Sequence, residues 1–315
     1  MEKTAKQRII ESVREVMPKT VKTCFWLIKI TVGISILILF LRYFNILPWF
    51  SELISPVFNF VGLPGEAALS FVTGYFVNVY SAIAVMVTLD LDARSITILS
   101  VMVLCAHNMI TETAVQKKTG SSATRIVIIR TLSALVLGFV LNLIMPGNVM
   151  QSASNAHVEQ ADLMQMVTTW FWSTLNVVLK MVVLIFSLSI LQRLLSEFGV
   201  IRWISKFLRP LLLIFGLPAK TSFLWIVANI LGLAYGAAIM MEETESGKIS
   251  KEDADLLNHH IGISHSNLED VLLLSSVGAM VVWMLLSRWA MSALLVWELR
   301  LEMFVRKKYV NLRIN

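Results

Sequence analysis

The chain has 315 residues, of which 57% are hydrophobic and only 15% are charged. Soluble domains carry about 25% charged residues, so this composition excludes an ordinary soluble protein and predicts a polytopic membrane protein. The formal net charge of +6 fits basic cytoplasmic loops, and we therefore expect no nucleic acid as a partner. Cys24 and Cys105 are too few for a disulfide framework and lack metal-type spacing.

The N-terminal segment, residues 1–20, is basic and amphipathic. It has neither an apolar core nor a small-residue cleavage site, so it does not resemble a cleavable signal peptide. We expect a helix on the cytoplasmic surface of the membrane.

Six later runs are each near the ~20 apolar residues that a helix needs to cross a bilayer. They contain few charges, and helices rather than barrel strands are indicated. The runs are Val21–Leu41, Ala67–Leu89, Ile126–Met145, Val167–Leu191, Ser222–Met241 and Val271–Leu295.

An internal repeat organises these runs. SPVFNFVGLP at 55–64 returns as RPLLLIFGLP at 209–218, and CAHNMITET at 105–113 aligns with ISHSNLEDV at 263–271. The alignment places His107 over His265, Gly120 over Gly278 and Arg130 over Arg288. Such an ordered series predicts two copies of one unit.

Each unit reads as a span, a short segment ending at Gly-Leu-Pro, a second span, a polar-tipped segment and a third span. The polar-tipped segment of the second unit, 253–270, carries Asp253, Asp255 and Glu269, which argues against crossing lipid. We therefore expect that neither 253–270 nor its counterpart 95–113 crosses.

The distribution of Lys and Arg agrees, because it places the basic segment 193–220 and both termini in the cytoplasm. Three spans per unit make the second unit enter from the opposite side. The expected fold is all-α, with two inverted-topology repeats, about six spans and two re-entrant segments. Its parts are 1–20, the surface helix; 21–146, repeat one; 147–165, an external joint; 166–300, repeat two; and 301–315, a basic cytoplasmic tail.

Polar groups at membrane depth are costly and default to functional candidates. The polar tips supply His107, Asn108 and Glu112 in one unit, and His265, Asn267, Glu269 and Asp270 in the other. In each unit a histidine precedes a carboxylate by about one helical turn, so both can face one cavity. Two readings stay open: these groups hold the tips in place, or they line a solute or ion site.

Two arginines and three further residues complete the candidate set. Arg130 and Arg288 either pair with Glu112, Glu269 or Asp270 or recognise a carboxylate or phosphate of a solute. Asn78, Asn229 and Tyr235 lie in the small-residue spans that follow Gly-Leu-Pro. They either contact solute or accompany close helix packing.

The Gly-Leu-Pro motif, the small-residue span after it and the tips CAHNMITET and ISHSNLED resemble the nucleoside-recognition, or Gate, domain family. Such domains form parts of concentrative nucleoside transporters, ferrous-iron transporters and spore-maturation membrane proteins. The resemblance covers both units and implies a transport-type helical fold with re-entrant segments. The sequence lacks the type of cysteine-containing tip expected of the iron transporters, which weakens an iron reading.

The sequence thus predicts a multi-pass protein of a bacterial inner membrane that transports a small polar solute, nucleoside-like or anionic, with proton or cation coupling. The alternatives are a non-transporting scaffold in envelope assembly and a divalent-metal permease. No P-loop, triad or zinc-hydrolase motif is present, so we expect neither an enzyme nor a cofactor. The expected partners are the lipid bilayer, the solute and a coupling ion, and a homodimer stays an option.

Overall fold

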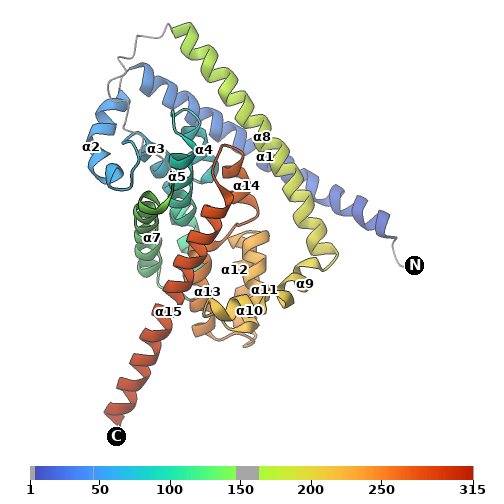
Figure 1. Cartoon of the computed structure of the whole chain (residues 1–315). Coiled ribbons are helices and arrows are strands. Elements are labelled where there is room, and N and C mark those ends of the chain that lie inside the picture. Colours follow the sequence, from blue (N-terminus) through green and yellow to red (C-terminus); the bar gives the residue numbers. More distant parts are fainter. Residues whose placement is uncertain (1–3, 45, 147–162, 315) are drawn as a thin grey trace.

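The computed structural model describes residues 4–44, 46–146 and 163–314, and these residues form an all-helical molecule (Figure 1). No strand occurs among them. The elements are α1 (Ala5–Tyr43), α2 (Ile46–Phe60), α3 (Ala67–Phe76), α4 (Val79–Met86), α5 (Ala93–Ala106), α6 (Met109–Lys118), α7 (Ala123–Ile144), α8 (Leu163–Glu197), α9 (Val200–Phe207), α10 (Arg209–Ile214), the 3₁₀ turn η1 (Ala219–Thr221), α11 (Ser222–Ile230), α12 (Leu233–Glu245), α13 (Lys251–Ser264), α14 (Glu269–Ser275) and α15 (Val281–Ile314).

The long helices α1 and α8 lie against each other and run in opposite directions (Figure 1). Arg8 near the start of α1 pairs with Glu197 at the end of α8, and Glu15 pairs with Arg193. Because this pairing continues along α1, residues 5–20 do not form the separate surface helix that the sequence suggests. They continue without a break into the apolar run, through Pro18.

The second apolar run of each unit doubles back instead of continuing straight. Helices α3 and α4 pack on each other, and the Ser70 hydroxyl donates a 2.9 Å hydrogen bond to the Ala82 carbonyl. In the other unit, Gly236 of α12 faces Ala228 of α11 so closely that an added Cβ would lie 3.0 Å from the Ala228 Cβ. The runs 67–89 and 222–241 are therefore helical hairpins, and the expectation that each is a span is wrong.

The polar-tipped segments take the place of these spans. Arg94 at the start of α5 donates to carbonyls of Asn142 and Met145 at the end of α7, whereas α6 ends close to the start of α7. The α5–α6 segment therefore runs antiparallel to α7 along its whole length. By length and composition it is a candidate membrane span, a possibility that the expectation of a re-entrant 95–113 did not include.

The second unit repeats this arrangement. Glu252 at the start of α13 pairs with Lys307 near the end of α15, and α14 ends shortly before α15 begins. The α13–α14 segment thus runs antiparallel to α15. The third apolar run, expected over 271–295, is also divided, because 269–275 forms α14 and the long helix begins only at Val281.

Among the described residues, five helical segments are long and apolar enough to cross a membrane. These are Ala5–Leu41, Ala93–Lys118, Ala123–Ile144, Leu163–Glu197 and Val281–Lys308. Their outer faces carry exposed apolar side chains such as Phe25, Leu132, Val183 and Leu286. In a polytopic membrane protein, lipid covers these faces.

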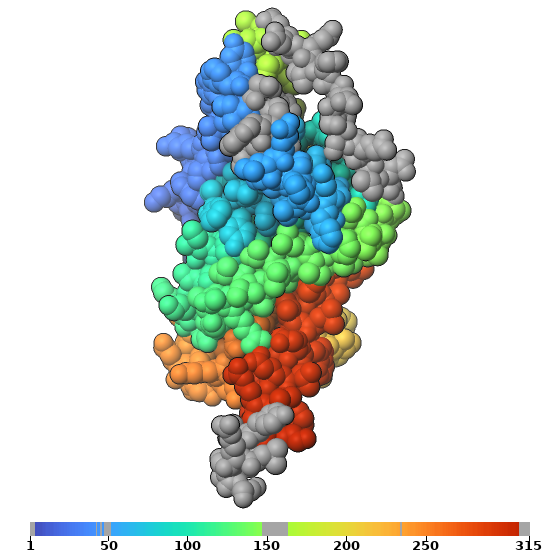
Figure 2. Space-filling view, turned by 90° about the vertical axis from the view of Figure 1, so that its left-hand side faces the viewer, coloured from blue at the N-terminus to red at the C-terminus, as the bar shows by residue number. Residues whose placement is uncertain are grey.

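The α5, α7, α13 and α15 helices form the centre of the molecule, since α5 packs on α7, α13 packs on α15, and α13 also contacts α5 and α7. Figure 2 shows an elongated molecule with α7 crossing its face above α15. The expected joint 147–165 lies almost entirely outside the described residues.

Two glycines of the second unit differ in how closely neighbouring atoms approach them. Gly216 and Gly199 both have positive φ, 76° and 68°, but an added Cβ at Gly216 would lie 3.1 Å from Val296 and Trp297 atoms, whereas none lies within 4 Å at Gly199. We expect Gly199→Ala to cost about 1 kcal/mol from backbone strain. Gly216→Ala adds a packing cost of about 1–3 kcal/mol. The unfolding midpoint of the purified protein in detergent checks this order, and equal midpoints would contradict it.

Candidate functional site

The two polar tips share one backbone design. Helix α5 ends at Ala106, and Asn108 then adopts φ 49° before α6 begins. Helix α13 ends at Ser264, and Ser266 adopts φ 53°. Left-handed conformations are uncommon for residues other than glycine. Two of them at aligned positions mark a specified break between α5 and α6 and another between α13 and α14.

Each break is hydrogen-bonded to the neighbouring hairpin. The Asn108 N–H donates to the Gly74 carbonyl at 2.9 Å, and the Ser266 N–H donates to the Ala228 carbonyl at 3.2 Å. The hairpins are themselves interrupted beside these contacts, at Asn78 and at Gly232. Four helix interruptions are thus brought together in two pairs.

A fully buried arginine binds the backbone carbonyls at each break. Arg130 on α7 donates to the carbonyls of Cys105 at 2.9 Å and His107 at 2.8 Å. Arg288 on α15 donates to the carbonyls of Ile263 at 3.3 Å and His265 at 3.2 Å. The last carbonyls of a helix lack partners within the helix and carry partial negative charge. Each guanidinium therefore stabilises the open end of one broken helix.

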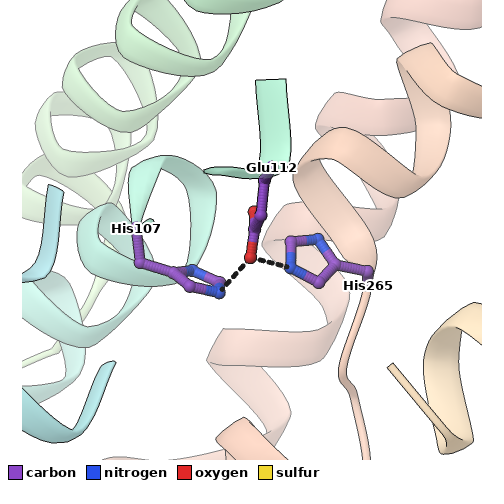
Figure 3. Close-up of side chains that lie close together, drawn as sticks. All are labelled: His107, Glu112 and His265. Carbon is purple, nitrogen blue, oxygen red and sulfur yellow. Dashed lines mark hydrogen bonds and ion pairs between the residues drawn. The ribbon is translucent and has the colours of Figure 1, made fainter. Parts of the chain in front are cut away.

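Glu112 lies between the two histidines (Figure 3). Its Oε1 is 3.2 Å from His107 Nε2 and 3.2 Å from His265 Nε2, and its Oε2 forms a 2.7 Å ion pair with Arg130. The imidazole centroids are 5.0 Å apart. A side chain from one unit therefore bridges the tips of both units.

Asp270 extends this cluster from the second unit. Its Oδ2 is 3.5 Å from His107 Nε2, and its backbone N–H bonds to the Ser266 carbonyl just as that of Glu112 bonds to the Asn108 carbonyl. Glu112 and Asp270 are 8% and 7% exposed, and the two histidines are more deeply buried. Buried charges are stable only when they are paired and hydrogen-bonded, as they are in this cluster.

The outer nitrogens of the histidines fix their tautomers. His265 Nδ1 lies 2.7 Å from the Ile261 carbonyl, and His107 Nδ1 lies 3.2 Å from the carbonyls of Val103 and Leu104. A carbonyl only accepts hydrogen bonds, so Nδ1 carries the proton in both rings. In a neutral ring, Nε2 then presents a lone pair to the Glu112 carboxylate. The Nε2 lone pairs and the carboxylate oxygen are all acceptors and repel one another. A proton or a cation between them is therefore required to make these contacts favourable.

The remaining polar residues of the second tip form a neighbouring network. Asn267 donates to Asn229 Oδ1 at 2.6 Å and accepts from Arg288 at 2.6 Å. Glu269 accepts from the Tyr80 hydroxyl at 2.6 Å. Asn267, Asn229 and Glu269 therefore adjoin the cluster without entering it.

Two sequence candidates take no part in the ionisable cluster. Asn78 caps α4 through its bond to the Ser81 N–H. Tyr235 is 53% exposed, and its hydroxyl accepts from Lys19. Conversely, Tyr80 and Gln192 contact Glu269, although sequence reasoning did not include either of them among the site residues. The sequence pattern that could have identified them is a polar side chain inside an otherwise apolar run.

Fold and cluster together define an all-α polytopic membrane protein in which two helical segments, α5–α6 and α13–α14, break at buried ionisable groups. A family profile for nucleoside recognition, Gate, matches residues 24–145. The chain is 30% identical over 270 residues to the uncharacterized membrane protein YvoD of Bacillus subtilis, an alignment covering 84% of this chain and 86% of the relative. The chain belongs to the nucleoside-recognition (Gate) family of membrane proteins. No solved structure matches it significantly.

The buried ion pair makes a direct prediction. Arg130→Met leaves the Glu112 carboxylate and two helix carbonyls without their cation, and we expect it to cost about 3–5 kcal/mol. Arg125→Met, on the same helix, removes a half-buried surface pairing with Glu298 and Glu302, and we expect a cost of about 0–1 kcal/mol. Adding Glu112→Gln to Arg130→Met should recover part of the loss.

Unfolding midpoints of these variants in detergent provide the measurement. Equal destabilisation by Arg130→Met and Arg125→Met would contradict the assignment of Arg130 to the buried cluster.

Proposed function

We propose that the protein is a secondary transporter that moves a small polar solute, nucleoside-like or anionic, across a bacterial inner membrane by alternating access. The observation that carries this proposal is the meeting of two broken crossing segments at the buried residues His107, Glu112 and His265. Ionisable groups at such depth are costly to retain. Transporters place solute and ion sites at helix interruptions of this kind.

An inverted-topology repeat, with units at 21–146 and 166–300, supports the mechanism. The antiparallel pairing of α1 with α8 favours it, and so does the pairing of Arg125 near the start of α7 with Glu298 and Glu302 late in α15. The aligned histidines, carboxylates and arginines occupy equivalent places in the two units. Such units can rock against each other around a fixed central site.

We infer that the α3–α4 and α11–α12 hairpins are the re-entrant elements. The α11–α12 hairpin begins and ends on the same side, since Lys220 before α11 pairs with Asp253 at the start of α13. Their interruptions leave backbone groups unpaired by helix bonds next to the tips. A polar solute would find hydrogen-bonding partners there without a fully charged pocket.

Side chains for recognition come from both units. Nη1 of Arg130 is buried and has no hydrogen-bond partner among the described residues, so it can donate to a carbonyl or anionic oxygen. Asn267 and Asn229 supply amide groups on the other side. We assign coupling by a proton or cation to the Glu112 cluster, because its convergent acceptors need positive charge. Both termini are cytoplasmic in this proposal, and a homodimer is its simplest oligomer.

Uptake into proteoliposomes tests the proposal. Wild-type protein, offered radiolabelled nucleosides, nucleobases and small carboxylates, should accumulate at least one of them above protein-free liposomes. His107→Gln with His265→Gln should lower that uptake at least about tenfold, the effect of roughly 1.4 kcal/mol. Glu298→Gln, at an exposed position of α15 outside the cluster, is the matched control.

Uptake that is unchanged in the double variant would remove the cluster from the transport path. Absence of uptake for every solute would favour a non-transporting membrane scaffold.

A further inference from the structure

Three ligand atoms converge at the tips from both units. One donor atom each from His107, Glu112 and His265 lies within 4.8 Å of the other two. The contacts from Glu112 Oε1 to each Nε2 are 3.2 Å. Ligand atoms of a tetrahedral zinc ion, about 2.0–2.1 Å from the metal, are separated by roughly 3.3 Å. The two contacts therefore already have the spacing of a coordination shell.

The outer contacts hold these atoms in the form that a metal requires. Metal-binding histidines commonly donate their other N–H to a carbonyl or carboxylate, which fixes the tautomer. Here Nδ1 of His265 faces the Ile261 carbonyl, and Nδ1 of His107 faces those of Val103 and Leu104. Arg130 binds the far oxygen of Glu112. The near oxygen and both Nε2 lone pairs are thereby directed to one point.

The surrounding charge also favours a cation. With neutral imidazoles, Arg130 and Arg288 oppose the carboxylates of Glu112, Glu269 and Asp270, which leaves an excess of negative charge. Asp270 Oδ2 lies 3.5 Å from His107 Nε2, beside the three-atom group but outside it. The two cysteines are not in this cluster.

We propose that His107 Nε2, His265 Nε2 and Glu112 Oε1 bind one divalent first-row transition-metal ion, with Asp270 beside it. Two imidazoles with carboxylates suit zinc, cobalt, iron or manganese, whereas calcium and magnesium prefer an all-oxygen shell. The ion would tie the tips of the two units together. The proposal concerns the same site as the proposed transport function, but metal binding alone, measured without transport, decides it.

Equilibrium binding to the full chain in detergent tests the site. Protein stripped with a chelator is titrated with Zn²⁺, and bound metal is counted by elemental analysis. We expect one zinc ion per chain in the wild type and at least about tenfold weaker binding in His107→Gln and in His265→Gln. His259→Gln, on the same helix as His265 but outside the cluster, should bind like the wild type.

Cobalt distinguishes ligation from a merely structural role. His265→Cys that binds Co²⁺ should show a thiolate-to-cobalt charge-transfer band that the wild type lacks, because only a direct ligand produces it. Helical circular dichroism and a single gel-filtration peak confirm that each variant is folded.

Stripped wild type that binds no Zn²⁺ would overturn the metal site, as would undiminished binding by His107→Gln and His265→Gln. Zinc binding without uptake of any solute would retain the metal site and reject transport. Uptake without zinc binding would retain the transport function and reject the metal site.

Discussion

Two buried guanidinium groups, each closing the open end of a broken helix, are the constraint on which the rest of the structure depends. Inside a bilayer no water satisfies the carbonyls that a helix leaves unpaired where it stops. Arg130 and Arg288 supply these partners at equivalent carbonyls, Cys105 and His107 in one unit and Ile263 and His265 in the other. The cations in turn need buried anions, and Glu112 pairs with Arg130.

The positions of the histidines follow from this constraint. Each histidine is the C-cap residue of its helix. The arginine that binds its backbone carbonyl therefore also fixes the position from which the imidazole ring projects. Because the two broken helices pack side by side, their rings meet across Glu112. Membership in the nucleoside-recognition family connects this geometry with transport-type membrane proteins. A metal ion at the same point would make the contact between the units depend on an occupant.

The sequence predicts the all-helical membrane fold, and its repeat places His107, Glu112, His265 and Asp270 together at the polar tips. An aligned histidine and an aligned carboxylate in each unit, Glu112 over Asp270, carry that information. The sequence did not reveal which segments cross, because hydropathy reports contact with lipid. Segment 251–264 is polar yet buried within protein by α15, α5 and α7. Run 222–241 is apolar, but the close approach of Gly236 to Ala228 turns it into a hairpin. Tyr235 likewise points outward to Lys19, a contact with the N-terminal part of α1 that no local pattern encodes.

Labelling of single cysteines from each side of the membrane tests the opposed arrangement of the two units most directly. Cys24 and Cys105 are buried, so the wild-type chain serves as the unlabelled reference for an impermeant maleimide. Exposed positions Asp90 and Lys118 flank the crossing segment of the first unit, and Lys248 and Met280 flank that of the second. Cysteines at Lys118 and Lys248 should react only from the cytoplasmic side, and those at Asp90 and Met280 only from the outside. Labelling of Asp90→Cys and Lys118→Cys from the same side would contradict the crossing of α5–α6 and with it the meeting of two opposed tips.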